Sequence, residues 1–125
     1  MDITLIMDLD IDDRFKAYLY EECRYMTDEE FNEFFDGCTI DGDTITTPEK
    51  RYGVMVLSEM DAIAEMNYIV EEHLENIKTI TRHQYDWLLD AINAEQLADK
   101  FPINEFYPDC IETEWENQTF YYYDA

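Results

Sequence analysis

The stretch Tyr52-Gly-Val-Met-Val-Leu57, together with the pattern that follows it as far as Ile77, decides the fold. The six residues form a short apolar run rich in β-formers, which predicts a buried strand. Ser58 is a preferred helix N-cap, and Asp61 stands where a capping box ends. Beyond it, apolar residues recur every three or four positions: Met60, Ile63, Met66 or Asn67, Val70, Leu74 and Ile77. The sequence therefore predicts a strand followed by a helix of about five turns with one apolar, buried face.

The residues before this stretch predict one more strand, two helices and a hairpin. Residues 3–9 are apolar enough for a strand at or near the centre of a sheet, and a helix should run from about residue 12 to residue 26. Thr27-Asp-Glu-Glu30 is a capping box that opens a short helix, with Gly37 as its left-handed stop. Residues 38–46 read as a hairpin with a type I′ turn at Asp41-Gly42. The side chains expected to face inward from the two helices are Phe15, Leu19, Cys23, Phe31, Phe34 and Phe35.

The residues after it predict a third main helix and a terminal hairpin. Thr81-Arg-His-Gln84 repeats the capping-box pattern, and Phe101-Pro102 should end the helix that it opens. Residues 110–115 and 118–123 should pair around Glu116-Asn117. We therefore expect one α+β domain, residues 1–125, with about three main helices packed on one side of a small, mostly antiparallel sheet. The apolar stripe of the third helix would be Tyr85, Leu88, Leu89, Ile92 and Leu97.

The balance of charge restricts the possible partners. The chain holds 31 acidic and 8 basic residues, a formal net charge of −23, while a hydrophobic content of 46% argues against a disordered acidic tail. A net charge of about 2–8 is enough for the solubility of a small domain. Nucleic acid and anionic membranes both attract basic surfaces, so neither is expected as a direct partner. With no signal segment, no long apolar run and three widely spaced cysteines, the sequence predicts a cytoplasmic protein with free thiols.

Motifs for catalysis and metal binding are incomplete. Leu5-Ile-Met-Asp8-Leu-Asp10 resembles the first motif of haloacid-dehalogenase-type phosphotransferases, which implies Asp8 as nucleophile and Asp10 as acid/base with Mg²⁺. The Gly-Thr that usually follows is Ile11-Asp12, and the later acidic motif is missing. A calcium loop beginning at Asp8 fails at its sixth and twelfth positions. We therefore expect no enzymatic activity, no cofactor and no dedicated metal site.

Three groups of carboxylates lack nearby bases, and we predict that they bind a partner. Neighbours on one helix face lie about 5–6 Å apart at Cβ, and alternate residues of a strand about 6.8 Å apart, near the spacing of phosphates along a duplex. A run of tyrosines at the end of the chain would add exposed aromatic contacts. The acidic residues are Asp28, Glu29, Glu33 and Asp36; Glu71, Glu72 and Glu75; and Glu112, Glu114 and Glu116; the aromatic ones are Tyr121, Tyr122 and Tyr123.

In size, acidity, aromatic content and lack of a catalytic motif, the chain resembles the acidic phage and mobile-element inhibitors that mimic DNA, such as anti-restriction and anti-CRISPR proteins. The resemblance is one of class and carries over no individual residue. It implies a non-enzymatic inhibitor that blocks the nucleic-acid site of a basic nuclease or CRISPR effector in the host cytosol, with a homodimer possible. The alternatives are an acidic adaptor unrelated to nucleic acid, and a solvated or halophilic acidic coat with no partner.

Overall fold

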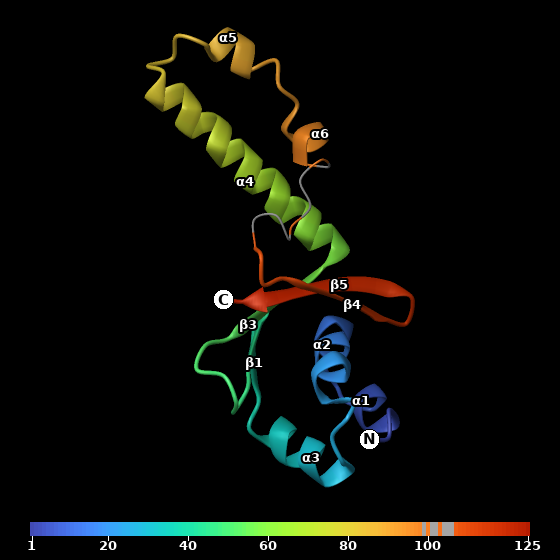
Figure 1. The fold of residues 1–125 in the computed structure, drawn as a ribbon. Coiled ribbons are helices and arrows are strands. Elements are labelled where there is room, and N and C mark those ends of the chain that lie inside the picture. The colour runs from blue at the N-terminus through green and yellow to red at the C-terminus, as the bar shows by residue number, and fades with distance from the viewer. Residues whose placement is uncertain (99, 101–102, 104–106) are drawn as a thin grey trace. The chain divides into compact units, whose positions relative to one another are not determined.

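The computed structural model describes residues 1–98, 100, 103 and 107–125, and the predicted helix end at Phe101-Pro102 lies outside them. The chain divides into two compact units (Figure 1). Unit 1 comprises Met1–Glu59 and Asp109–Ala125, and unit 2 comprises Met60–Pro108. That the two units fold together as one domain stays a prediction.

Unit 1 contains a five-stranded antiparallel sheet, which confirms the α+β prediction. The strands lie in the order β1-β2-β3-β5-β4, so β1 and β4 are its two edges. The central pairing joins β3 to β5 over five residue pairs, from Val54 opposite Asp124 to Ser58 opposite Phe120. The bounds are β1 Thr39–Asp41, β2 Thr44–Thr46, β3 Val54–Ser58, β4 Ile111–Trp115 and β5 Gln118–Asp124.

Three helices belong to unit 1, α1 (Thr4–Met7), α2 (Asp13–Cys23) and α3 (Asp28–Asp36). The start of α2 is fixed by Asp12, whose carboxylate accepts the Arg14 N–H. At α3 both bonds of the predicted capping box are present, since Thr27 accepts the Glu30 N–H and the Glu30 carboxylate accepts the Thr27 N–H.

The core of unit 1 lies between α2 and the face of the sheet that α2 covers, called here the inner face. The predicted inward residues of α2, namely Phe15, Leu19 and Cys23, are all buried, as are Val54 and Val56 of β3. The ring of Tyr18 meets that of Tyr122 edge-on, with centroids 4.8 Å apart. The prediction that Phe31 and Phe34 face inward is also confirmed, and Phe35 is half-buried.

Three local predictions in unit 1 are wrong. Residues 3–9 contain the short helix α1 rather than a central strand: Ile6 supplies its one buried side chain, and the Lys16 ammonium satisfies the Met7 carbonyl at its end. Gly37 is right-handed (φ −88°), and its small size matters because an added Cβ would lie 3.0 Å from Pro48. The first hairpin turns at Gly42-Asp43, where only Gly42 has positive φ (+59°), so the turn is not type I′.

Unit 2 is built along the long helix α4 (Glu59–Ile80), which follows β3 directly as predicted. Its buried residues are Ala62, Met66 and Val70. The predicted inward face is wrong at Met60, Ile63 and Ile77, whose side chains are exposed. The buried residues recur every four positions, at Ala62, Met66 and Val70, so the buried stripe passes neither Met60 nor Ile63. Ile77 lies beyond Val70, the last fully buried residue of this stripe.

The predicted third main helix is replaced by two short ones, α5 (Asp86–Leu89) and α6 (Ala94–Ala98). Thr81-Arg-His-Gln84 ends α4 instead of opening a new helix. The His83 N–H donates to the Lys78 carbonyl and the Arg82 N–H to the Thr79 carbonyl, the two bonds of a Schellman motif. Arg82 and His83 accordingly have φ values of +55° and +63°. The three substantial helices among the described residues are therefore α2 and α3 of unit 1 and α4 of unit 2.

Candidate functional site

The acidity is unevenly divided between the two units. Unit 1 holds 21 acidic and 5 basic residues, a net charge of −16, and unit 2 holds 10 and 3, a net charge of −7. Unit 1 is also the unit with the sheet and the larger core. Its carboxylates are therefore carried by elements that the core holds in place.

The basic side chains of unit 1 make local contacts that leave most of its carboxylates without a counter-charge. Arg14 pairs with Asp43 and donates to the carbonyls of Gly42 and Val56, which ties α2 to the β1–β2 turn and to β3. Lys50 pairs with Asp124 at 3.0 Å. The three others are Lys16, which donates to Met7; Arg24, which lies 4.0 Å from Glu21; and Arg51, which lies over the ring of Tyr52. Within the described residues, none of the five pairs with a carboxylate of α3 or β4.

The α3 surface carries the first predicted group. Asp28, Glu29, Glu33 and Asp36 are all exposed. Among the described residues only Asp28 of these four forms a hydrogen bond, accepting the backbone N–H of Asp2 at 2.9 Å. Negative charge at Asp28 and Glu29 is favourable to the N-terminus of the helix. Glu33 and Asp36 lie beyond the first turn, so the helix dipole does not account for them.

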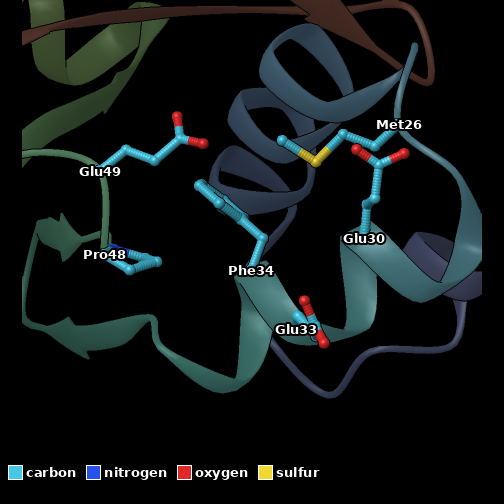
Figure 2. A pocket seen from close by; sticks show the side chains of 6 residues that line it. All are labelled: Met26, Glu30, Glu33, Phe34, Pro48 and Glu49. Atoms are coloured by element: carbon cyan, nitrogen blue, oxygen red, sulfur yellow. The ribbon is translucent and has the colours of Figure 1, made fainter.

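A pocket beside α3 adds two carboxylates that the sequence analysis did not select, Glu30 and Glu49. Its apolar part is formed by Met26, Phe34 and Pro48. Figure 2 shows Glu49, from the loop after β2, pointing toward the ring of Phe34, while Glu30 lies beside Met26 on the other side. Glu30 is expected from the sequence only as a capping residue. The hairpin predicted over residues 38–46 is the signal for Glu49, because it returns the chain to the end of α3.

The β4 surface carries the group at Glu112–Glu116. Thr113 and Trp115 point to the inner face, where Trp115 meets the ring of Tyr20, so Glu112 and Glu114 project from the opposite face. Glu116 and Asn117 form the turn of the terminal hairpin with φ values of +50° and +66°, as in a type I′ turn. The predicted hairpin at this turn is confirmed.

The third predicted group, Glu71, Glu72 and Glu75, lies on α4 and thus in unit 2. All three side chains are exposed. Glu72 accepts the O–H of Tyr68 at 2.9 Å, and Glu75 lies 3.3 Å from the Lys78 ammonium. Glu75 is thus partly neutralised, unlike the carboxylates of α3 and β4.

Within unit 1, the structure places the predicted acidic residues on two separate surfaces. Within unit 1, α3 leads into the edge strand β1, whereas β4 is the opposite edge of the sheet (Figure 1). The α3 and β4 groups are therefore two separate surfaces of one unit, and the α4 group belongs to the other unit.

The prediction that the terminal tyrosines are exposed is wrong. Tyr122 and Tyr123 are buried, and Tyr121 is half-buried. Strand alternation points the side chain of Tyr122 to the inner face. Burial is the main cause that raises the pKa of Tyr122, and its hydrogen bond to Glu22 raises it further. Burial and the neighbouring Glu112 carboxylate raise the pKa of Tyr121. Among the described residues, the strongly exposed aromatic side chains are instead Tyr25, Tyr52, Tyr68, Tyr85 and Trp87.

The phosphotransferase-like motif lacks its structural context. Asp8 is the C-cap of α1 and not the residue after a strand. In the described part of the chain, no three His, Cys, Asp or Glu side chains are grouped closely enough to hold a metal ion. The three cysteines are free thiols, and burial raises the pKa of Cys23 to about 12 and that of Cys38 to about 11.

Comparisons of this chain with protein-family models, with curated proteins and with solved structures found no match. Among the described residues, no helix is both long enough and apolar enough to cross a membrane.

Proposed function

We propose that this protein is a non-enzymatic inhibitor that occupies the nucleic-acid site of a basic DNA-processing or defence protein. Its carboxylates would take the place of phosphates. One observation supports the proposal: all five bases of unit 1 make other contacts, while the carboxylates of α3 and β4 have no basic partner among the residues that the structure describes. Uncompensated charge on rigid elements is what a cationic groove attracts.

The turn residue Glu116 gives this proposal further support. A non-glycine residue in the left-handed region costs on the order of 1 kcal/mol, and Asn or Gly is preferred there. Glu116 has φ of +50° and therefore gains nothing in local stability over these residues. A carboxylate kept at such a position is consistent with selection for its charge.

Because α3 and β4 lie at different ends of unit 1, the proposal divides into two surfaces that are tested separately. One variant neutralises α3 (Asp28→Asn, Glu29→Gln, Glu33→Gln, Asp36→Asn), and another neutralises β4 (Glu112→Gln, Glu114→Gln, Glu116→Gln). A matched control removes three exposed charges elsewhere in unit 1 (Asp8→Asn, Asp10→Asn, Asp41→Asn). The surface that binds the target is the one whose neutralisation weakens binding well beyond the control.

The decisive experiment is competition with labelled duplex DNA for purified basic nucleases and CRISPR effectors, followed by fluorescence anisotropy. We expect this protein to displace the duplex and to lose at least about tenfold in affinity between about 50 mM and about 200 mM salt. A target that binds this protein while remaining fully bound to DNA overturns the proposal.

The second candidate, an acidic adaptor unrelated to nucleic acid, is favoured by one observation. Of the fifteen strongly exposed large apolar side chains among the described residues, nine lie in unit 2, although it has fewer residues than unit 1. An adaptor that binds through them would keep most of its affinity at moderate salt, and it would not compete with DNA.

A further inference from the structure

Five exposed apolar side chains occur together at one end of unit 2, from the last turns of α4 to α5. Ile80 and Trp87 are 79% and 74% exposed, and the other three are at least 43% exposed. Soluble monomers rarely leave large apolar groups together in water unless the patch binds something. We call this surface the α4–α5 tip; its residues are Ile77, Ile80, Tyr85, Trp87 and Leu88.

We propose that the α4–α5 tip docks into an apolar groove bordered by Lys and Arg on the target protein. This inference rests on the proposed function, because it takes the target to be the same basic protein. The tip of unit 2 would thus make the apolar contact with the partner that the terminal tyrosines were predicted to make. Tyr and Trp are the residue types most often found at the centre of such contacts.

The tip continues the apolar face of α4 past its buried part. Val70, Ile77 and Ile80 follow one another at helical spacing, yet Val70 is buried and the other two are exposed. Within the described residues, the face is therefore packed along its first half and left open at its end. Tyr85, Trp87 and Leu88 extend the open part onto α5.

The tip is held in a defined conformation. The Schellman motif fixes the direction of the chain after Ile80. The Lys78 ammonium binds Asp90, which ties α4 to the residue after α5, and His83 lies 3.0 Å from Asp86. A surface that is ordered before binding loses less conformational entropy when it docks.

The charge around the tip selects the occupant. Glu71, Glu72 and Glu75 lie on α4 just before the tip, and Asp86 and Asp90 lie within and beside α5. Residues 71–90 contain these five carboxylates but only two Lys or Arg residues. One of the two, Lys78, already contacts Glu75 and Asp90. A second copy of this chain would bring the same negative charge to the interface, whereas a groove lined with Lys and Arg complements it.

The test uses the full chain and two model peptides of equal charge. One is an amphipathic helical peptide of Leu and Lys, and the other has Ser in place of every Leu. We expect the Leu/Lys peptide to shift the emission of Trp87 to shorter wavelength and to protect amides 77–90 from hydrogen exchange. Trp115 is already buried, so it serves as the internal reference. The Ser/Lys peptide should bind at least about tenfold more weakly, because it lacks the apolar contact.

Single substitutions locate the site. Ile80→Ser and Trp87→Ser should each weaken the Leu/Lys peptide by about tenfold, while Met60→Ser, which changes an 81% exposed residue of the same helix, should not. Equal binding of the two peptides, protection outside the tip, or a dimer that Ile80→Ser dissociates in sedimentation equilibrium overturns the inference. If the tip binds the peptide but the protein never competes with DNA, the proposed function fails and the docking surface stands.

Discussion

Tyr122 on β5 donates its phenolic O–H to Glu22 on α2 over 2.9 Å, and this bond joins the sheet to the helix that covers it. Tyr122 is 2% exposed, and the ring of Tyr18 packs edge-on against it. The bond spans 100 positions in the chain, so it joins the C-terminal hairpin to the N-terminal part of unit 1.

We expect Tyr122→Phe to lower the free energy of unfolding by about 1.5–3 kcal/mol, the usual range for a hydrogen bond to a charged group. Urea unfolding followed by circular dichroism measures this. Tyr121→Phe is the matched control, because Tyr121 lies on the opposite face of the same strand and is only half-buried. If the two substitutions cost the same, the bond to Glu22 does not stabilise unit 1.

Thr44 of β2 lies close to Gly53, the residue before β3, so a substitution at one position should be compensated by a substitution at the other. A Cβ added at Gly53 would lie 2.2 Å from Cγ2 of Thr44, so Gly53→Ala should destabilise unit 1 by about 1–3 kcal/mol. Thr44→Ser removes that methyl group. Combined with Gly53→Ala it should restore most of the loss, as measured by thermal unfolding. A double variant no more stable than Gly53→Ala would show that the strain lies elsewhere.

The type I′ turn of the terminal hairpin predicts that stability and target binding change in opposite directions. Replacing Glu116-Asn117 by Asn-Gly suits the positive φ angles at both positions and should stabilise the protein by about 1 kcal/mol. If β4 binds the target, the same variant should compete less well with DNA. The midpoint of thermal unfolding and the anisotropy competition measure the two effects. A variant that is more stable and competes equally well excludes Glu116 from the contact.

The buried thiols predict a loss of stability in alkaline solution. Burial raises the pKa of Cys23 from its ordinary 9.0 to about 12, so between these values the unfolded chain is deprotonated while the folded chain keeps its proton. The free energy of unfolding should therefore fall above pH 9, by at most about 1.4 kcal/mol per pH unit for this thiol.

Urea unfolding at several pH values between 8 and 10 measures this slope before Tyr18 and Tyr122, whose raised pKa values start from 10.0, add to it. In Cys23→Ala the slope should become shallower, leaving the contributions of Cys38 and Cys110, whose pKa values burial also raises. A slope unchanged by this substitution contradicts the assignment.

Elements with strong local signals could be predicted from the sequence. The strand before Ser58, the helix after it, the capping box at Thr27 and the hairpin at Glu116-Asn117 all follow from residues within a few positions of one another. The residue types of Thr81-Arg-His-Gln84 also fit a helix start, which makes the prediction there wrong. The observed helix end depends on left-handed angles at Arg82 and His83 that neither residue type signals.

The candidate site could be predicted only in part, for a similar reason. The exposure of the carboxylates on α3 and β4 follows from helical spacing and strand alternation. Their separation depends on which strands become the edges, and that is set by the pairing of β3 with β5 across more than half of the chain. Glu49 comes close to α3 because the β1–β2 hairpin returns the chain to the end of that helix.

The place of β4 at the margin of the sheet has a consequence for self-assembly. An outermost strand presents unpaired backbone N–H and C=O groups, which can recruit the same strand of another molecule into a growing fibre. Because Glu112 and Glu114 stand on this strand, stacking two copies would bring their like charges together. We therefore expect the acidity of β4 to oppose edge-to-edge association of two chains, and its removal to take that protection away.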